Sequence, residues 1–248
     1  MRADDIALLA IAGFAGGAVN AIAGGGSLLV YPALVATGLS TIAANVTNSI
    51  ALWPGYIGNL IGIGKSALTM TLKYKDLAFI SAAGAAAGVS ILLHTSTDAF
   101  DVVVPFLVLL ATLLIALQPV IARHLTARAR HPIVLRVAIA LAAIYGGYFG
   151  GGLGVILLGT IGLTTSMELR ELNIVKAVLT MVVSSVALVC FVMFTSIDWL
   201  QVAVISPAAL LGGAVGGRIA MRINERVLRL IVVLFGAAVG MWLAVRAY

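Results

Sequence analysis

Two pairs of polar residues interrupt apolar segments at a spacing that lets each pair act together. Asn45 and Asn48 lie three residues apart, as do Asn173 and Lys176, so each pair shares one face of a helix. Amide and ammonium groups are hydrogen-bond donors that can replace the water around an oxyanion. These pairs, with Thr47 beside the first, predict a site for a small anionic solute. Two other interpretations stay open: the asparagines bond neighbouring helices, and Lys176 reaches out to water.

Two glycine-rich runs are the second place where the chain could meet a solute. Each run precedes an apolar half-helix, whose N-terminal N–H groups and positive dipole end suit an anion. The candidate residues are Gly24, Gly25, Gly26, Ser27, Gly150, Gly151 and Gly152. The alternative is that these glycines only permit a tight turn or close helix packing. Neither run is a phosphate-binding loop, because no Lys-Ser/Thr pair follows it.

The residue patterns that would indicate an enzyme are missing from the sequence. Cys190 is the single cysteine, so no disulfide or cysteine-based metal site can form within one chain. The three histidines have no second ligand at metal-binding spacing, and no nucleotide-binding motif is found. We therefore expect no catalytic residue, no metal and no cofactor. The net charge of +6 is spread through short gaps between apolar runs, which argues against nucleic acid as a partner.

The elements that carry the polar residues must lie in lipid. Of the 248 residues, 62% are hydrophobic and 10% are charged, whereas soluble domains are about half apolar and about a quarter charged. Most of the apolar stretches are long enough to cross about 30 Å of hydrocarbon as a helix. They cover residues 6–37, 42–64, 77–94, 102–121, 133–163, 171–196, 199–217 and 227–245. The predicted fold class is an all-α membrane protein surrounded by membrane lipid.

An internal repeat divides the chain. Four residues of the first copy and four of the second are separated by one constant offset. They are Asn45, Asn48, Gly84 and Gly88, followed by Asn173, Lys176, Gly212 and Gly216. Small residues four apart let helices approach closely in lipid, so these glycines predict packing. We predict a first transmembrane repeat at residues 1–122, a cytoplasmic basic linker at 123–136 and a second transmembrane repeat at 137–248.

The basic residues predict how the repeats cross the membrane. If every stretch crossed, the basic gaps at 65–75 and 123–136 would face away from the gap at 218–229, against the positive-inside rule. If 6–37 and 133–163 are instead re-entrant hairpins, all these gaps fall on one face, the cytoplasm. Each repeat then has one hairpin and three transmembrane helices, so the second copy is inverted. A broken helix that crosses once is the alternative for 6–37.

The chain resembles the sulfite exporter TauE/SafE family of permeases over essentially its whole length. The resemblance is carried by the glycine run that leads into Leu28-Leu29-Val30-Tyr31-Pro32, by Asn45-Val46-Thr47-Asn48, and by the second copies of both. It implies a bacterial inner-membrane permease for sulfite, organosulfonates or related sulfur-containing anions. The polar helix starts described above match those that recur in this family.

Together, the residues and the resemblance predict a secondary transporter that exports a small anion by alternating access. Interrupted helices in inverted repeats line the substrate path of many transporters, and irregular backbone at membrane depth is tolerated where it lines a cavity. A passive anion channel is the alternative function. Protons as the coupling ion and a homo-oligomeric state are further open alternatives.

Overall fold

The computed structural model describes residues 1–22, 24–123, 132–165, 167–219 and 225–247. These residues form eleven helices and no strand, which confirms the predicted all-α fold. The helices are α1 (Ala3–Ile22), α2 (Ser27–Ala36), α3 (Thr41–Ile63), α4 (Lys65–Lys73), α5 (Lys75–Leu93), α6 (Thr97–Arg123), α7 (Pro132–Tyr148), α8 (Leu153–Thr164), α9 (Leu169–Phe194), α10 (Trp199–Ile219) and α11 (Glu225–Ala247).

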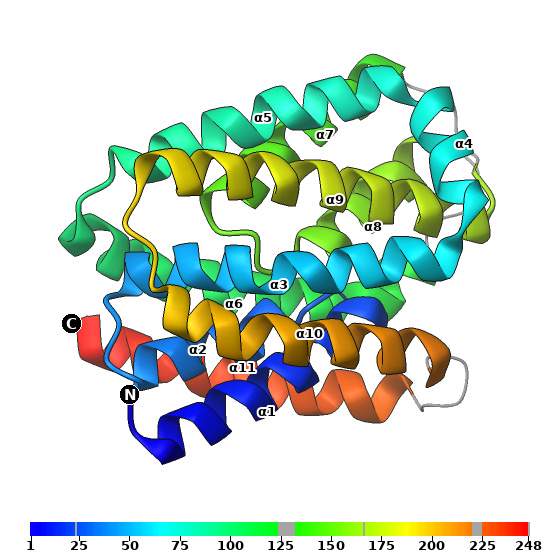
Figure 1. Ribbon diagram of the computed structural model, residues 1–248. Helices are drawn as coiled ribbons and strands as arrows, with labels where there is room; N and C mark the ends of the chain where they lie inside the picture. The colour runs from blue at the N-terminus through cyan, green and yellow to red at the C-terminus, as the bar shows by residue number, and fades with distance from the viewer. Residues whose placement is uncertain (23, 124–131, 166, 220–224, 248) are drawn as a thin grey trace.

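Two helical hairpins turn back inside the bundle. α1 runs inward from the N-terminus and α2 returns toward the same end, while α7 and α8 do the same from the opposite end (Figure 1). α2 has 10 residues and α8 has 12, so at about 1.5 Å per residue neither is long enough to cross about 30 Å of hydrocarbon. The turns use glycine at positive φ, with +80° at Gly24 and +77° at Gly150.

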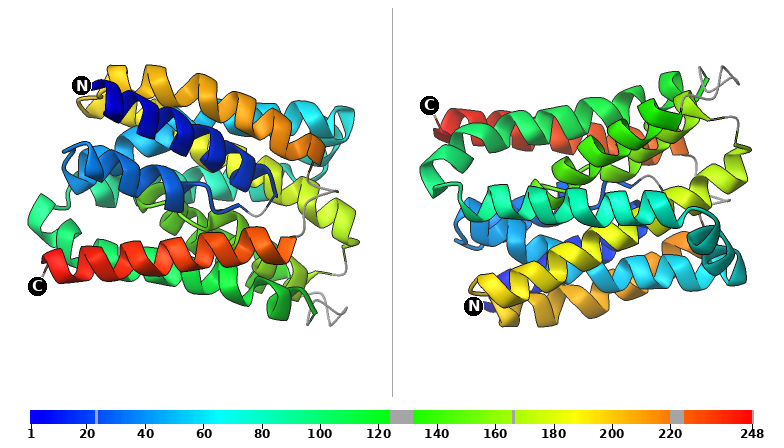
Figure 2. Two further views of the ribbon diagram at one scale, coloured as in Figure 1. Left: turned by 90° about the horizontal axis from the view of Figure 1, so that it is seen from below. Right: turned by 90° about the horizontal axis from the view of Figure 1, so that it is seen from above.

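The bundle has two distinct ends. Both termini lie at one end, here called the terminal end, and α4 lies at the other, here called the α4 end (Figures 1 and 2). α3 begins at the terminal end, where the Ser40 hydroxyl accepts a hydrogen bond from the Ala43 amide at 3.3 Å. It ends at the α4 end, where Gly64 adopts a φ of +71°. α3 therefore runs the length of the bundle.

Each hairpin packs on a helix from the other half of the chain. α1 lies along α10, and α7 lies along α5. Glycines allow this contact: a Cβ built on Gly212 would lie 2.0 Å from the Phe14 carbonyl oxygen, and one on Gly88 would lie 2.0 Å from that of Ile144. A Cβ built on Gly84 or on Gly216 would also lie too close to backbone atoms of the neighbouring helix. The predicted packing role of these four glycines is therefore confirmed.

The outer surface of the bundle suits lipid. Large apolar side chains such as Phe79, Leu141 and Leu211 are exposed on the helices. Of the described helices, five are long and apolar enough to cross a membrane, namely Ala3–Ile22, Lys75–Leu93, Thr97–Leu117, Arg170–Phe194 and Trp199–Gly216. The chain is a multi-pass helical membrane protein.

The two predicted repeats correspond to α1–α6 and α7–α11. α7 begins at Pro132, inside the range predicted as linker, while residues 124–131 of that linker lie outside the described residues. Of the predicted basic face, Lys73, Lys75 and Arg136 lie at the α4 end, and residues 220–224 lie outside the description. The inverted relation of the repeats and the membrane depth of the hairpins stay predictions.

Candidate functional site

A row of three cavities leads from the α4 end into the centre of the bundle. The first, the vestibule, has a volume of about 420 Å³ and is lined by residues from α1, α3 and α9. The second, the tip cavity, shares Asn59, Lys176 and Ala177 with the vestibule. The third, the inner cavity, shares Tyr56, Gly150 and Leu153 with the tip cavity. The tip and inner cavities measure about 20 Å³ each, so the row narrows sharply inward.

Two packed helices, α3 and α9, supply most of the polar groups along this row. On α9, Lys176, Thr180 and Ser184 recur every four residues and therefore share one face. On α3, Asn48 and Tyr56 lie two turns apart on one face. The two helices occupy matching places in the predicted repeats. If the predicted repeat holds, the cavities lie beside equivalent helices of the two halves.

The two hairpin tips meet at the tip cavity. A Cβ built on Gly24 would lie 3.3 Å from the Cα of Gly154, and one built on Gly154 would lie 3.4 Å from the Cα of Gly24. The Lys176 side chain passes close by, with its Cδ 3.9 Å from that second Cβ position. The tips, which come from opposite ends of the bundle, are thus in backbone contact beside a half-buried lysine.

Of the lining residues that the structure describes in the tip and inner cavities, Lys176 alone is charged. The other polar lining groups are hydroxyls and amides, which can donate a hydrogen bond to an anion. At the wider end, Arg170 and Asn173 join Lys176 around the vestibule, and Arg170 is exposed. Among the described residues that line the three cavities there is no carboxylate. This electrostatic arrangement favours a negatively charged solute.

Five of the predicted site residues are brought together by the cavities, and Asn173 lines the vestibule. Asn48 and Ser27 line the inner cavity, Gly24 and Lys176 line the tip cavity, and Gly150 lines both. The side chain of Asn48 is 2% exposed, and its Oδ1 has no hydrogen-bond partner within the described residues. A buried polar atom without a partner is costly, and this acceptor oxygen calls for a hydrogen-bond donor, so it does not itself select an anion.

The other predicted site residues lie away from these cavities. The glycines among them are in close packing, since a Cβ on Gly25 would meet Ile115 and one on Gly151 would meet the Phe149 ring. Gly26 and Gly152 are similarly crowded, by the Gly16 carbonyl and by Ala111. Thr47 is buried and lines none of the three cavities. Asn45 is also buried, and its Nδ2 donates to the Tyr148 carbonyl at 2.9 Å.

Several lining residues were not predicted from the sequence. Asn20 lines the tip cavity and holds the first hairpin, because its Oδ1 accepts a hydrogen bond from the Gly26 amide at 2.7 Å. Its Nδ2 donates to the Tyr56 hydroxyl at 3.4 Å. Thr180 and Ser184 could have been found from the four-residue spacing that begins at Lys176. Asn20 was harder to predict as a lining residue, because the sequence shows it only as a single amide inside an apolar helix.

The family model for the sulfite exporter TauE/SafE family matches residues 9–243. The chain belongs to this family. It is 26% identical to the probable membrane transporter protein ORF9 of Sinorhizobium sp, across 94% of this chain and 90% of that protein. It is 23% identical to the probable membrane transporter protein YfcA of Escherichia coli K12, across 89% and 82%. A probable membrane transporter protein of Haemophilus influenzae is 25% identical, across 93% and 91%. No solved structure matches the chain.

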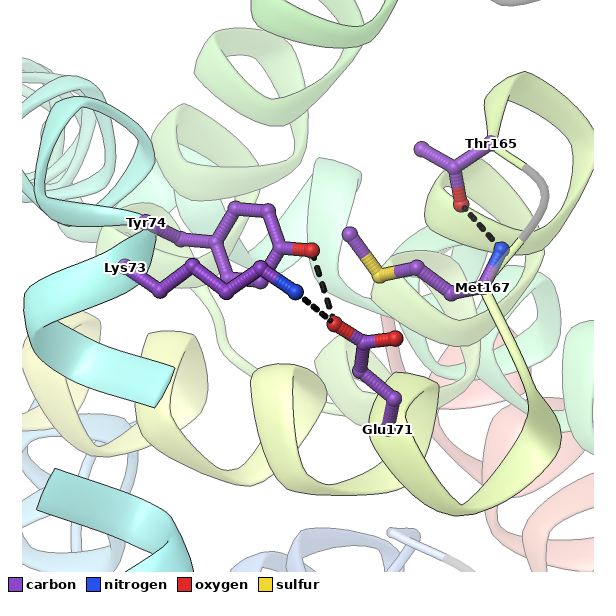
Figure 3. A network of polar contacts seen from close by, with 5 residues as sticks. All are labelled: Lys73, Tyr74, Thr165, Met167 and Glu171. Atoms are coloured by element: carbon purple, nitrogen blue, oxygen red, sulfur yellow. Dashed lines mark hydrogen bonds and ion pairs between the residues drawn. The ribbon is translucent and has the colours of Figure 1, made fainter. Parts of the chain in front are cut away.

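In this TauE/SafE family member, a polar network fixes the start of α9 (Figure 3). The Lys73 ammonium donates to Glu171 Oε1 at 2.6 Å, and the Tyr74 hydroxyl donates to the same oxygen at 2.8 Å. The hydrogen bond to Glu171 raises the pKa of Lys73. The Lys73 side chain is 54% exposed, so this ion pair adds little stability. The network places the end of α4 against the start of α9, which is the helix that carries Lys176.

A separate cavity of about 270 Å³ lies at the terminal end. The charged residue in its described lining is Asp101, whose carboxylate accepts a hydrogen bond from the Thr41 hydroxyl. This outer cavity shares no lining residue with the inner cavity. Phe149, which lines the inner cavity, meets the Tyr31 ring edge to face with ring centroids 5.7 Å apart, and both are almost fully buried. Of the three cavities in the row, the vestibule is the one at the α4 end.

Proposed function

We propose that this chain is a secondary transporter that moves a small sulfur-containing anion, such as sulfite or an organosulfonate, across the inner membrane. Membership of the TauE/SafE family supports a transporter. The observation that carries the choice of an anion is that Lys176 and both hairpin tips line one cavity whose described lining residues include no carboxylate. A charged group inside a membrane protein is expensive and usually functional.

We propose export as the direction of transport. The described basic residues Lys73, Lys75 and Arg170 lie at the α4 end, where the vestibule is. By the positive-inside rule that end faces the cytoplasm. A solute loading from the cytoplasm would reach Lys176 through the vestibule, as the first step of export would require, although an importer would release its solute by the same path. Alternating access would then require the outer cavity to join the inner one.

The test is flux through purified protein in proteoliposomes, with sulfite, sulfate, taurine and sulfoacetate compared side by side. We expect saturable transport of at least one sulfur-containing anion, and counterflow when that anion is present on both sides. Lys176→Gln should weaken the transport, whereas Lys75→Gln, which changes an exposed lysine at the start of α5, should not.

Each alternative gives a different result in the same assay. A passive anion channel would give flux that rises linearly with concentration and shows no counterflow. Transport of all four solutes at rates no greater than in empty vesicles would reject the proposed substrate class. Equal effects of Lys176→Gln and Lys75→Gln would remove the role assigned to the tip cavity.

A further inference from the structure

The two hairpin tips are held by opposite kinds of hydrogen bond. In the first tip, the side-chain oxygen Asn20 Oδ1 accepts a hydrogen bond from the Gly26 amide. In the second tip, donors cover two carbonyl oxygens: Asn45 Nδ2 donates to Tyr148 at 2.9 Å, and the Tyr145 hydroxyl donates to Gly151 at 2.5 Å. A carbonyl oxygen repels an anion, while an amide N–H attracts one. The bonding of the second tip therefore favours an anion, and that of the first does not.

Groups that complement an anion converge on the second tip. Gly150, Leu153 and Gly154 line the tip cavity at the N-terminal end of α8, whose first turn has no side-chain cap. The Gly154 amide makes no hydrogen bond to another described residue. Thr180 lines the same cavity, is 8% exposed, and has a hydroxyl without a partner there. This buried hydroxyl indicates a ligand independently of the helix end.

We propose that the second tip, residues 149–154, is the anion-recognition loop, and that Asn45 and Tyr145 are positioning residues that orient it. This inference rests on the proposed function. The sequence predicted the same anion-binding role for both glycine runs, and the inference assigns that role to the second run alone. The first tip supports the second through the backbone contact of Gly24 with Gly154. Asn45 acts through the Tyr148 carbonyl and does not touch the solute.

Hydrogen exchange measured by mass spectrometry on the full chain in lipid nanodiscs tests the positioning role without any solute. Tyr145→Phe removes only the hydroxyl that binds Gly151, and Asn45→Ala removes the donor to Tyr148. Both variants should speed exchange of peptides covering 149–154 by about tenfold, while peptides covering 24–28 exchange as in wild type. Tyr56→Phe is the matched control, because its hydroxyl contacts Asn20 in the first hairpin. It should leave exchange of the second tip unchanged.

Sulfite added to the wild-type protein tests the recognition role. We expect sulfite to slow exchange of 149–154 more than that of 24–28. In flux assays, Tyr145→Phe should raise the apparent KM about tenfold with little change in the maximal rate, since the loss of orientation weakens binding. A tip that only supports the fold would instead lower the yield of folded protein and leave KM unchanged.

Several outcomes would overturn the inference. Unchanged exchange of 149–154 in both variants would reject the positioning role whatever the solute is. Protection of 24–28 alone, or of neither tip at a saturating concentration of a transported anion, would reject the recognition role. If no anion is transported, the proposed function fails, and the exchange of the solute-free variants still decides whether Asn45 and Tyr145 orient the tip.

Discussion

Replacing Lys176 with glutamine removes one positive charge from the tip cavity and keeps a side chain that can donate hydrogen bonds. Lys176 lies two turns into α9, roughly 10 Å from the start of that helix at 1.5 Å per residue. It is half-buried, and no other described residue that lines the tip cavity is charged. A bound anion would therefore lose its only ionic partner among the residues that line the tip cavity.

The expected magnitude follows from that geometry. A hydrogen bond to a charged group contributes about 1.5–3 kcal/mol when its partners are withdrawn from water. Since about 1.4 kcal/mol corresponds to a factor of ten, Lys176→Gln should raise the apparent KM by about 10- to 150-fold. Lys176→Arg should recover part of this loss, because it restores the charge with a different hydrogen-bonding geometry.

The assay is the initial rate of anion flux into proteoliposomes against anion concentration, normalised to folded protein and repeated at low and high ionic strength. Arg170→Gln is the informative control, because Arg170 is exposed at the vestibule. Its effect should be smaller and should fade at high salt, where exposed charges are screened over about 3 Å at 1 M. The effect of Lys176→Gln should persist at high salt. Wild-type kinetics in Lys176→Gln would refute the reasoning and indicate that this lysine only reaches out to water.

Three further predictions concern the tips and the topology. Gly154→Val should abolish flux with a near-normal yield of folded protein, because the added side chain would force the touching tips apart; flux at the wild-type rate would contradict this. Asn20→Ala should lower stability by about 1–3 kcal/mol, because it leaves a tip amide without its acceptor; an unchanged thermal unfolding curve would count against it. In a Cys190→Ser background, cysteines at Lys73 and Asp198 should label from the cytoplasm and from outside respectively, and labelling from the same face would reject the hairpin topology.

The features that were predictable from the sequence depend on local spacing. Apolar stretches of sufficient length require lipid, and glycines four apart require close helix contact, so the helical fold and the packing of Gly88 and Gly212 could be anticipated. That Asn48 and Tyr56 share one face of α3 also follows from helical periodicity. These inferences need no knowledge of which helices meet.

The features that escaped prediction depend on contacts between distant segments. Asn45 and Tyr148 are 103 residues apart, and their hydrogen bond could not be inferred from either segment alone. The same holds for Asn20, whose role appears only when the first hairpin folds back on itself. A glycine run also does not reveal which of its residues face a cavity. Gly24 and Gly150 do so, while Gly25 and Gly151 are crowded by Ile115 and Phe149.

The proposed alternating access requires the outer cavity to join the inner cavity. α3 contributes Thr41 to the outer cavity, Asn48 to the inner cavity and Asn59 to the vestibule, so one helix lines the whole route. Tyr31 on α2, one turn before Val35 of the outer cavity, packs against Phe149, which lines the inner cavity. These rings belong to the two different hairpins, so opening to the terminal end means separating the hairpins at this contact. The same movement would shift the second tip relative to Lys176, and would therefore weaken anion binding as the outer path opens.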